Sequence, residues 1–190
     1  QFQQGRFFDQ YSIKEEIGQG AFSTVSICIE KSSGKTYACK AVNLRPLRLN
    51  PGFQEQRLLR EVRNMTHLQH PNVVKLMSVF APDAADDTMR YVLEYVDGSE
   101  LFDSILARGK YSESDARPIF RQIASALAYL HSIHIVHRDI KPENIKISSA
   151  GVVKLLDFGL SKDLHEGGQV SLGRTFVGTP CYIAPEVEMA

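Results

Sequence analysis

The sequence predicts an α+β chain in which a five-stranded, largely antiparallel sheet with one helix precedes a mainly helical part. Alternating apolar residues such as Val25, Ile27 and Ile29 predict strands in the first half. In the second half, apolar residues recur at helical spacing instead. The two patterns meet at residues 97 and 98, where an Asp-Gly pair indicates the boundary between two lobes.

The first half reads as strands separated by turns. Two strands flank the glycine-rich turn in YSIKEEIGQGAFSTVSICIE, and the turn SSGK precedes a third strand. The segment NLRPLRLNPG is rich in breakers and is expected to be an irregular connection. The strands are expected over residues 11–30 (two strands), 36–42, 70–80 and 89–96.

One helix is expected over residues 53–68. Leu58, Val62 and Met65 share one face of it, and Glu61 lies on the same apolar stripe. A buried carboxylate requires a partner. Lys40, on a strand among small and apolar neighbours, is the cation that can supply one.

The second half is expected to contain a long helix capped by Ser112. Its inward face consists of apolar residues at helical spacing: Ile119, Ile123, Leu127 and Leu130. Short strands follow, and a stretch rich in Gly, Ser, Thr and charge then reads as an exposed loop. These segments are residues 135–136, 145–147 and 152–155 for the strands and 161–179 for the loop.

Composition narrows the classes of function. The chain has 22 basic and 22 acidic residues, so its formal net charge is zero and it has no broad basic field for nucleic acid or an anionic membrane. Three scattered cysteines favour a reduced compartment, so we expect an intracellular protein in the cytoplasm, the nucleus or both. The chain begins with Gln1 rather than Met, and we expect it to be part of a longer protein.

Five motifs occur in a fixed order along the chain. They are IGQGAFSTV (17–25), YACK (37–40), HRDIKPEN (137–144), DFG (157–159) and APE (184–186). Their order and spacing resemble the signature set of eukaryotic-type protein kinases, from about Tyr11 to the last residue. A P-loop NTPase would require G-x-x-x-x-G-K-[ST], and a Rossmann enzyme would require its glycine-rich turn to lead into a helix; neither pattern is present.

The resemblance implies a bilobal protein-kinase fold. Residues 11–96 would form the ATP-binding N-lobe, and residues 97–190 the first part of a helical C-lobe that is incomplete here. DIKPEN is typical of Ser/Thr kinases rather than Tyr kinases. ELFD (100–103) and GTPCYIAPEV (178–187) resemble the calcium/calmodulin-dependent group, and SLGRTFVGTPCYIAPEV is similar to checkpoint-type kinases that carry a forkhead-associated domain.

The same resemblance implies the roles of the catalytic residues. Lys40, paired with Glu61, would hold the ATP phosphates. Asp139 would accept or orient the substrate hydroxyl proton, and Lys141 would stabilise the transferring phosphoryl group. Asn144 and Asp157 would hold Mg2+. ATP would also be contacted by Ile17, Gly18, Gln19, Gly20, Ala21, Phe22, Ser23, Thr24, Val25, Ala38, Glu94, Val96, Glu100 and Lys146.

Substrate choice and regulation are also implied by resemblance. Glu100 and Glu143 match positions that pair with an arginine upstream of the acceptor in basophilic relatives. Thr179 fits a Ser/Thr kinase because its hydroxyl can bond Asp139 and Lys141. Thr175 lies where an activation-loop phosphate could bridge to Arg138. The expected partners are protein substrates and either an upstream kinase or a second copy that autophosphorylates the chain.

Lys146 departs from the family pattern. The family has an apolar residue there, as the floor beneath adenine, and a buried ammonium is costly. Lys146 could extend its head into water or stack over the base, and we expect weaker ATP binding in either case. Lys146, Pro118 within the long helix and the short C-lobe leave a second hypothesis open, that of a pseudokinase or ATP-binding scaffold.

Overall fold

A computed structural model describes residues 2–51, 53, 55–82, 86–159, 161–163 and 178–188. The chain forms two compact units. Unit 1 comprises Gln1–Val62 and Lys75–Tyr95, and unit 2 comprises Arg63–Val74 and Val96–Ala190. The sequence prediction had placed all of residues 11–96 in one lobe. Residues 63–74 group with unit 2 instead because Val73 bridges to Leu155 and Asn72 Nδ2 donates to the Val153 carbonyl at 2.9 Å.

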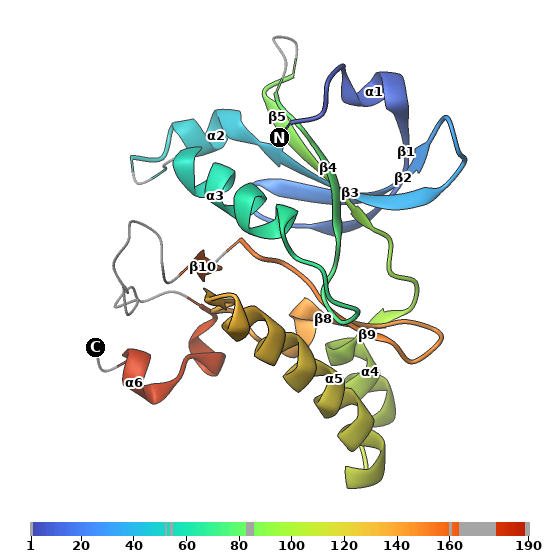
Figure 1. Cartoon of the computed structure of the whole chain (residues 1–190), viewed down its shortest axis with the longest axis vertical. Coiled ribbons are helices and arrows are strands. Elements are labelled where there is room, and N and C mark those ends of the chain that lie inside the picture. The colour runs from blue at the N-terminus through green and yellow to red at the C-terminus, as the bar shows by residue number, and fades with distance from the viewer. Residues whose placement is uncertain are drawn as a thin grey trace. The chain divides into compact units, whose positions relative to one another are not determined.

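Unit 1 is built on the predicted five-stranded antiparallel sheet, whose strands run in the order β1-β2-β3-β5-β4 (Figure 1). Each pair of neighbours in that order is antiparallel. The strands are β1 (Tyr11–Gln19), β2 (Ser23–Glu30), β3 (Thr36–Asn43), β4 (Leu76–Phe80) and β5 (Thr88–Glu94).

The helix expected over residues 53–68 is α3 (Glu55–Thr66), whose first part belongs to unit 1. The breaker-rich connection was predicted wrongly, because it contains a short helix, α2 (Leu44–Arg48). Asn43 caps α2, and its side chain accepts a hydrogen bond from Arg45 N at 3.0 Å. Pro46 is tolerated because first-turn N–H groups have no partner within a helix.

A second short helix, α1 (Phe7–Gln10), leads into β1 and brings an aromatic ring to the core of unit 1. The Phe7 ring stacks on Tyr11, with centroids 5.3 Å apart, and meets Phe80 edge-on at 5.5 Å. Phe7 is only 3% exposed, whereas its neighbour Phe8 is 48% exposed. The N-terminal segment is therefore part of the core of unit 1.

We predict that Phe7→Ala lowers the free energy of unfolding by about 3–5 kcal/mol, because it leaves a cavity among buried rings. Phe8→Ala removes the same atoms from an exposed position and should cost less than about 1 kcal/mol. Chemical denaturation of the two variants measures the difference. Equal losses would show that Phe7 is not a core residue.

Among the described residues of unit 2, the longest helices are α4 (Leu101–Arg108) and α5 (Glu113–Ser132). A small sheet in the order β6-β8-β9 lies beside them (Figure 1). Its strands are β6 (Ser99–Glu100), β8 (Ile145–Ile147) and β9 (Val153–Leu155); β7 (Ile135–Val136) pairs with β10 (Lys162–Asp163). The remaining elements are the 3-10 turns η1 (Pro142–Asn144) and η2 (Pro180–Tyr182), and α6 (Pro185–Glu188).

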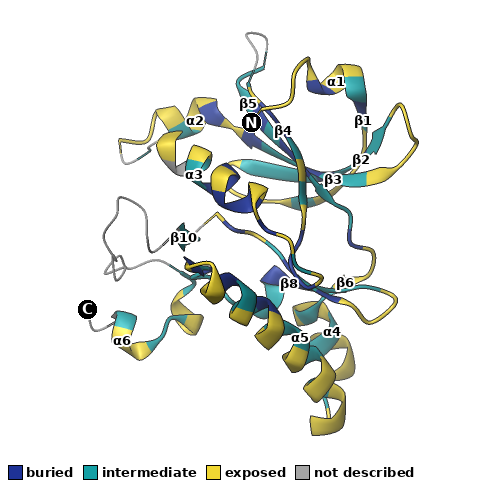
Figure 2. Ribbon diagram, viewed as in Figure 1, coloured by how far each residue is buried: buried dark blue, intermediate teal, exposed yellow. Residues whose placement is uncertain are grey.

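The predicted cap of α5 is confirmed, since Ser112 Oγ accepts a hydrogen bond from Asp115 N at 3.2 Å. Figure 2 shows buried and partly buried positions along α5 among exposed ones. Ala126 and Leu130 are its fully buried residues. Pro118 is accommodated inside α5. Within the described part of the chain, no helix has the length and apolar character that crossing a membrane requires.

Gly98 allows the backbone just before β6 to pack closely against the backbone of β8. Its φ is +98°, and a Cβ at this position would lie 2.2 Å from the Ile147 carbonyl oxygen. No L side chain fits there, because the clash is with backbone. This close approach fixes the register that pairs Ser99 with Ile147 and Glu100 with Lys146.

Candidate active site

Unit 1 contains the predicted Lys40–Glu61 ion pair. Lys40 lies on β3 and Glu61 on α3, and the distance from Nζ to Oε1 is 3.4 Å. The side chains are 19% and 8% exposed respectively. Glu61 therefore sits on the buried stripe of its helix, as predicted, with Lys40 as its counter-ion.

The glycine-rich turn joins β1 to β2 in the same unit. Gly20 N donates to the Ser23 carbonyl at 2.7 Å and so closes the turn. A Cβ at Gly20 would come within 2.9 Å of Ser23 Oγ. Ser23 stands where the glycine-rich pattern has its third glycine, and a side chain at position 20 would require Ser23 Oγ to move. Several of the residues predicted to contact ATP lie on this turn and the adjoining strands: Ile17, Gly18, Gln19, Ala21, Phe22, Thr24 and Val25.

Unit 2 contains the predicted catalytic loop, between β7 and β8. Asn144 Nδ2 donates to Asp139 Oδ2 at 2.9 Å and to the Asp139 carbonyl at 2.8 Å. Lys141 Nζ lies 3.3 Å from Asp139 Oδ2. The Asn144 amide and the Lys141 ammonium thus both contact the same carboxylate oxygen, Oδ2 of Asp139.

Thr179 completes this cluster from a distant part of the chain. Its hydroxyl donates to Asp139 Oδ1 at 2.7 Å and accepts from Lys141 Nζ at 2.9 Å. Both bonds were anticipated for a Ser/Thr kinase. Gly178 brings the backbone close enough: its φ is +128°, and a Cβ there would lie 3.0 Å from the Arg138 carbonyl oxygen.

Asp139 is an acceptor that remains ionised at neutral pH. Burial acts to raise the pKa of its carboxyl group, but hydrogen bonds from Thr179, Asn144 and Lys141 outweigh it. The net effect is a pKa below the ordinary value of an aspartate. The carboxylate can therefore accept a hydrogen bond or a proton throughout the neutral range.

His137 positions Asp139, a role that the sequence did not reveal. The ring is buried and meets Phe158 edge-on at 4.9 Å, as expected for a packing residue. Nε2 lies 2.8 Å from the Leu156 carbonyl, and Nδ1 accepts from Asp139 N at 3.3 Å. Nε2 must therefore carry the proton. Burial lowers the pKa of the imidazole, which is consistent with a neutral ring.

Two residues beside this cluster have unusual backbone conformations. Arg138 has φ +67° and Asp157 has φ +48°, both in the left-handed region. Non-glycine residues in this region concentrate at functional sites. Thr175, the predicted phosphorylation position, lies outside the described residues.

Asn144 and Asp157 have the donor chemistry that Mg2+ requires. The amide nitrogen of Asn144 is used on Asp139, which leaves its Oδ1 as the end available to a cation. The Asp157 carboxylate belongs to an exposed residue, and its Oδ1 accepts from Gly159 N at 3.1 Å. Oxygen donors of this kind suit a hard cation. No group of three or more His, Cys, Asp or Glu side chains suited to a metal ion occurs among the described residues.

Lys146 makes a contact that the sequence did not suggest. Its ammonium donates to the Val96 carbonyl at 3.1 Å. Lys146 also lies directly across from Glu100 in the β6–β8 pairing. The backbone carbonyl and the carboxylate together explain how a partly buried ammonium is tolerated.

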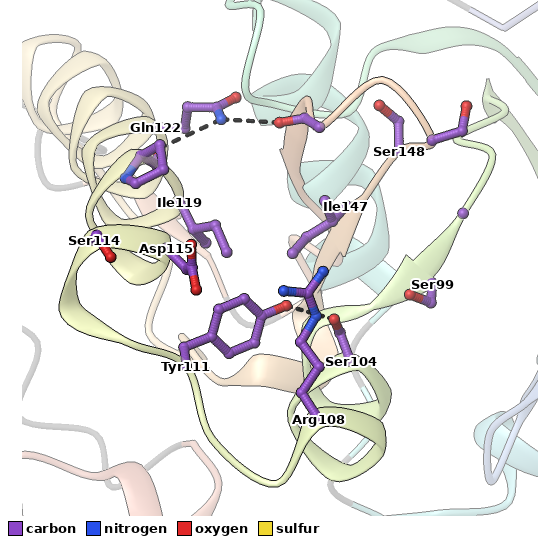
Figure 3. A pocket seen from close by; sticks show the side chains of 14 residues that line it. Ser99, Ser104, Arg108, Tyr111, Ser114, Asp115, Ile119, Gln122, Ile147 and Ser148 are labelled. Atoms are coloured by element: carbon purple, nitrogen blue, oxygen red, sulfur yellow. Dashed lines mark hydrogen bonds between the residues drawn. The ribbon is translucent and has the colours of Figure 1, made fainter.

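A cavity of about 580 Å³ lies elsewhere in unit 2, among α4, α5 and the β6–β8 strands. Figure 3 shows Ile119 and Ile147 pointing into it, together with Arg108 and Tyr111. The Arg108 guanidinium stacks on the Tyr111 ring at 4.9 Å. None of the predicted catalytic or metal-binding residues lines this cavity.

The sheet with its Lys–Glu pair and the loop that surrounds Asp139 define the protein-kinase class of phosphotransferases. The chain belongs to the protein kinase domain family, which matches residues 11–188.

Several curated relatives are kinases by name, and one of them is named a serine/threonine-protein kinase. The chain is 41% identical over 186 residues to a Caenorhabditis elegans calcium/calmodulin-dependent protein kinase type II, with 96% of the chain and 24% of the relative covered. It is 41% identical over 180 residues to Dictyostelium discoideum myosin light chain kinase A (93% and 58% covered). It is 38% identical over 179 residues to the Schizosaccharomyces pombe serine/threonine-protein kinase cds1 (93% and 38% covered). The chain thus spans between about a quarter and three fifths of these relatives.

Proposed function

We propose that the protein containing this chain transfers the γ-phosphoryl group of ATP to Ser or Thr side chains of other proteins. The observation that carries the proposal is the Asp139 carboxylate, held by Asn144, Lys141 and Thr179. Phosphoryl transfer depends on positioning and charge neutralisation rather than on a covalent intermediate. An ionised acceptor with an ammonium 3.3 Å away suits both requirements.

Each residue has a stated task in this proposal. Asp139 accepts the hydrogen bond of the substrate hydroxyl and orients its oxygen. Lys141, bonded to Thr179, offsets negative charge that develops during transfer. Thr179 ties the segment that would receive the substrate to Asp139 through its 2.7 Å hydrogen bond.

Residues of unit 1 would bind the nucleotide, and Asn144 and Asp157 of unit 2 have the oxygen donors that would bind Mg2+. Bound ATP would supply the phosphoryl group, and Mg2+ would offset the negative charge of the phosphate oxygens. Lys40, kept in place by Glu61, would bind phosphate oxygens, and the backbone of the Gly20 turn would approach them without a Cβ clash. Ala38 on β3 and Glu94 at the end of β5 would border the adenine.

Comparing acceptor residues tests this proposal. Peptides that differ only in having Ser, Thr or Tyr at the acceptor position are incubated with the full-length protein, ATP and Mg2+. We expect phosphorylation of the Ser and Thr peptides and none of the Tyr peptide. Phosphorylation of the Tyr peptide alone, or of no peptide despite ATP binding, would contradict the proposal.

We further propose a preference for basic residues upstream of the acceptor. Glu100 and Glu143 lie near enough for their charges to interact, since Glu143 contributes to raising the pKa of Glu100. Asp103 adds a third carboxylate. A substrate arginine would neutralise part of this negative charge.

Thr175 is the proposed regulatory phosphorylation position, modified either by an upstream kinase or by autophosphorylation. A phosphate there would pair with Arg138, next to Asp139 in the chain. After treatment with an activating kinase, the Thr175→Ala variant should have only the activity of the dephosphorylated natural sequence. Equal activity of Thr175→Ala and the natural sequence would exclude the switch.

A further inference from the structure

The row of side chains on one face of the β6–β8 pair has an unusual charge pattern. Glu100 and Lys146 are direct partners in the antiparallel register, so their side chains project from the same face. The next pair, Ser99 with Ile147, faces the opposite side, where Figure 3 shows Ile147 directed into the cavity. The small sheet therefore separates the cavity from a face that carries Glu100 and Lys146.

The ammonium of Lys146 is held in place on that face. Nζ donates to the Val96 carbonyl at 3.1 Å, and both residues belong to unit 2. An ammonium that is partly removed from water is stabilised by a nearby carboxylate. Glu100, four residues after Val96, is that carboxylate: Lys146 acts to lower its pKa.

Negative charge exceeds positive charge among the groups that act on Glu100. Burial is the largest cause that raises the pKa of Glu100, followed by Asp103, and Glu143 acts in the same direction. Three carboxylates with one ammonium leave a net charge of −2 when all four groups are ionised. Among the described residues, Glu143 Oε2 is buried and has no hydrogen-bond partner. Glu143 as a whole is only partly buried, so the accessible part of its carboxylate can meet a substrate cation, whereas Glu100 already faces Lys146.

We propose that Lys146 is a specificity-determining residue that acts as the built-in counter-ion of Glu100. A basic residue of the substrate must then compete with Lys146 for the Glu100 carboxylate. It is therefore recognised chiefly by Glu143. The protein consequently discriminates less strongly between basic and neutral substrates than it would with an apolar residue at position 146. This inference rests on the proposed substrate preference, but its test below does not require phosphoryl transfer.

The test compares the binding of two peptides that differ only in Arg or Gln at the upstream position, by fluorescence anisotropy on the full-length protein. Lys146→Met removes the charge and keeps most of the apolar side chain, whereas Lys146→Arg keeps the charge. We expect the Arg/Gln affinity ratio to rise about five- to tenfold in Lys146→Met, as for a charge pair in a partly wet site, and to change less than about twofold in Lys146→Arg.

Glu100→Gln and Glu143→Gln complete the design. With Lys146 present, Glu100→Gln should change the ratio less than about twofold, and in the Lys146→Met background it should lower the ratio about fivefold. Glu143→Gln should lower the ratio in both backgrounds. The inference is overturned if Lys146→Met leaves the ratio unchanged, or if Glu100→Gln acts equally in both backgrounds.

Phosphorylation of the same peptides separates this inference from the proposed function. If the ratios shift as expected but no peptide is phosphorylated, the counter-ion role stands and the proposed activity fails. If peptides are phosphorylated and the ratios do not shift, the activity stands and the role of Lys146 is refuted. A protein that fails to fold is recognised by thermal denaturation. Lys146→Gln, which also removes the charge, then replaces Lys146→Met, with the same rise in the ratio expected and an unchanged ratio contradicting the inference.

Discussion

Replacing Asp139 by Asn is expected to reduce phosphoryl transfer about 10²- to 10⁴-fold, the range typical of a lost acid–base group. The amide cannot accept the proton of a substrate hydroxyl, although its oxygen can still accept a hydrogen bond from Thr179. Because Asp139 is not among the residues assigned to the nucleotide, the affinity for Mg·ATP should change only a few-fold. Initial rates with a Ser peptide and the binding of a fluorescent nucleotide measure the two quantities.

Asp9→Asn is the matched control, since it makes the same chemical change at an exposed position in α1. It should leave both the transfer rate and nucleotide binding unchanged. If Asp139→Asn retained more than a tenth of the activity, Asp139 would not be the group that accepts or orients the hydroxyl proton.

Removing Lys40 is expected to have the second large effect, on stability as well as on activity. Lys40→Met removes the ammonium that lies 3.4 Å from the buried Glu61 carboxylate, which should cost about 3 kcal/mol of unfolding free energy. It also removes a positive charge from the proposed phosphate site, so nucleotide binding and transfer should both fall. Chemical denaturation and nucleotide titration measure the two effects.

Adding Glu61→Leu to Lys40→Met separates these two effects. The double variant has no buried carboxylate at position 61. It should therefore recover most of the stability lost in Lys40→Met but none of the activity. A double variant that is less stable than Lys40→Met would show that Glu61 is stabilised by something other than Lys40.

Much of the fold could be predicted because its signals are local. Alternation and turn residues located the five strands, and the apolar stripe with Glu61 located α3. The short helices α1 and α2 were missed because segments of four or five residues carry no periodicity. The grouping of residues 63–74 with unit 2 depends on a bridge between Val73 and Leu155, which no local pattern encodes.

The sequence predicted those parts of the candidate site whose functional groups all lie within one motif. Asp139, Lys141 and Asn144 lie within six residues, so their meeting follows from one loop. The partner of Lys146 could not be predicted from sequence, because the contact with Val96 joins residues separated by 50 positions. The hydrogen bond from Asp139 N to His137 was missed for another reason, since it depends on which ring nitrogen carries the proton.

The central claim is that the Asp139 cluster supports phosphoryl transfer to Ser and Thr. The alternative is a protein that binds ATP without transferring its phosphoryl group. Single-turnover transfer from γ-labelled ATP to a basic Ser peptide, at saturating Mg·ATP, tests it most directly. The account predicts label on the peptide serine with the natural sequence and its loss in Asp139→Asn. Tight binding of Mg·ATP with no transfer to any Ser or Thr peptide would contradict it, and would favour an ATP-binding scaffold instead.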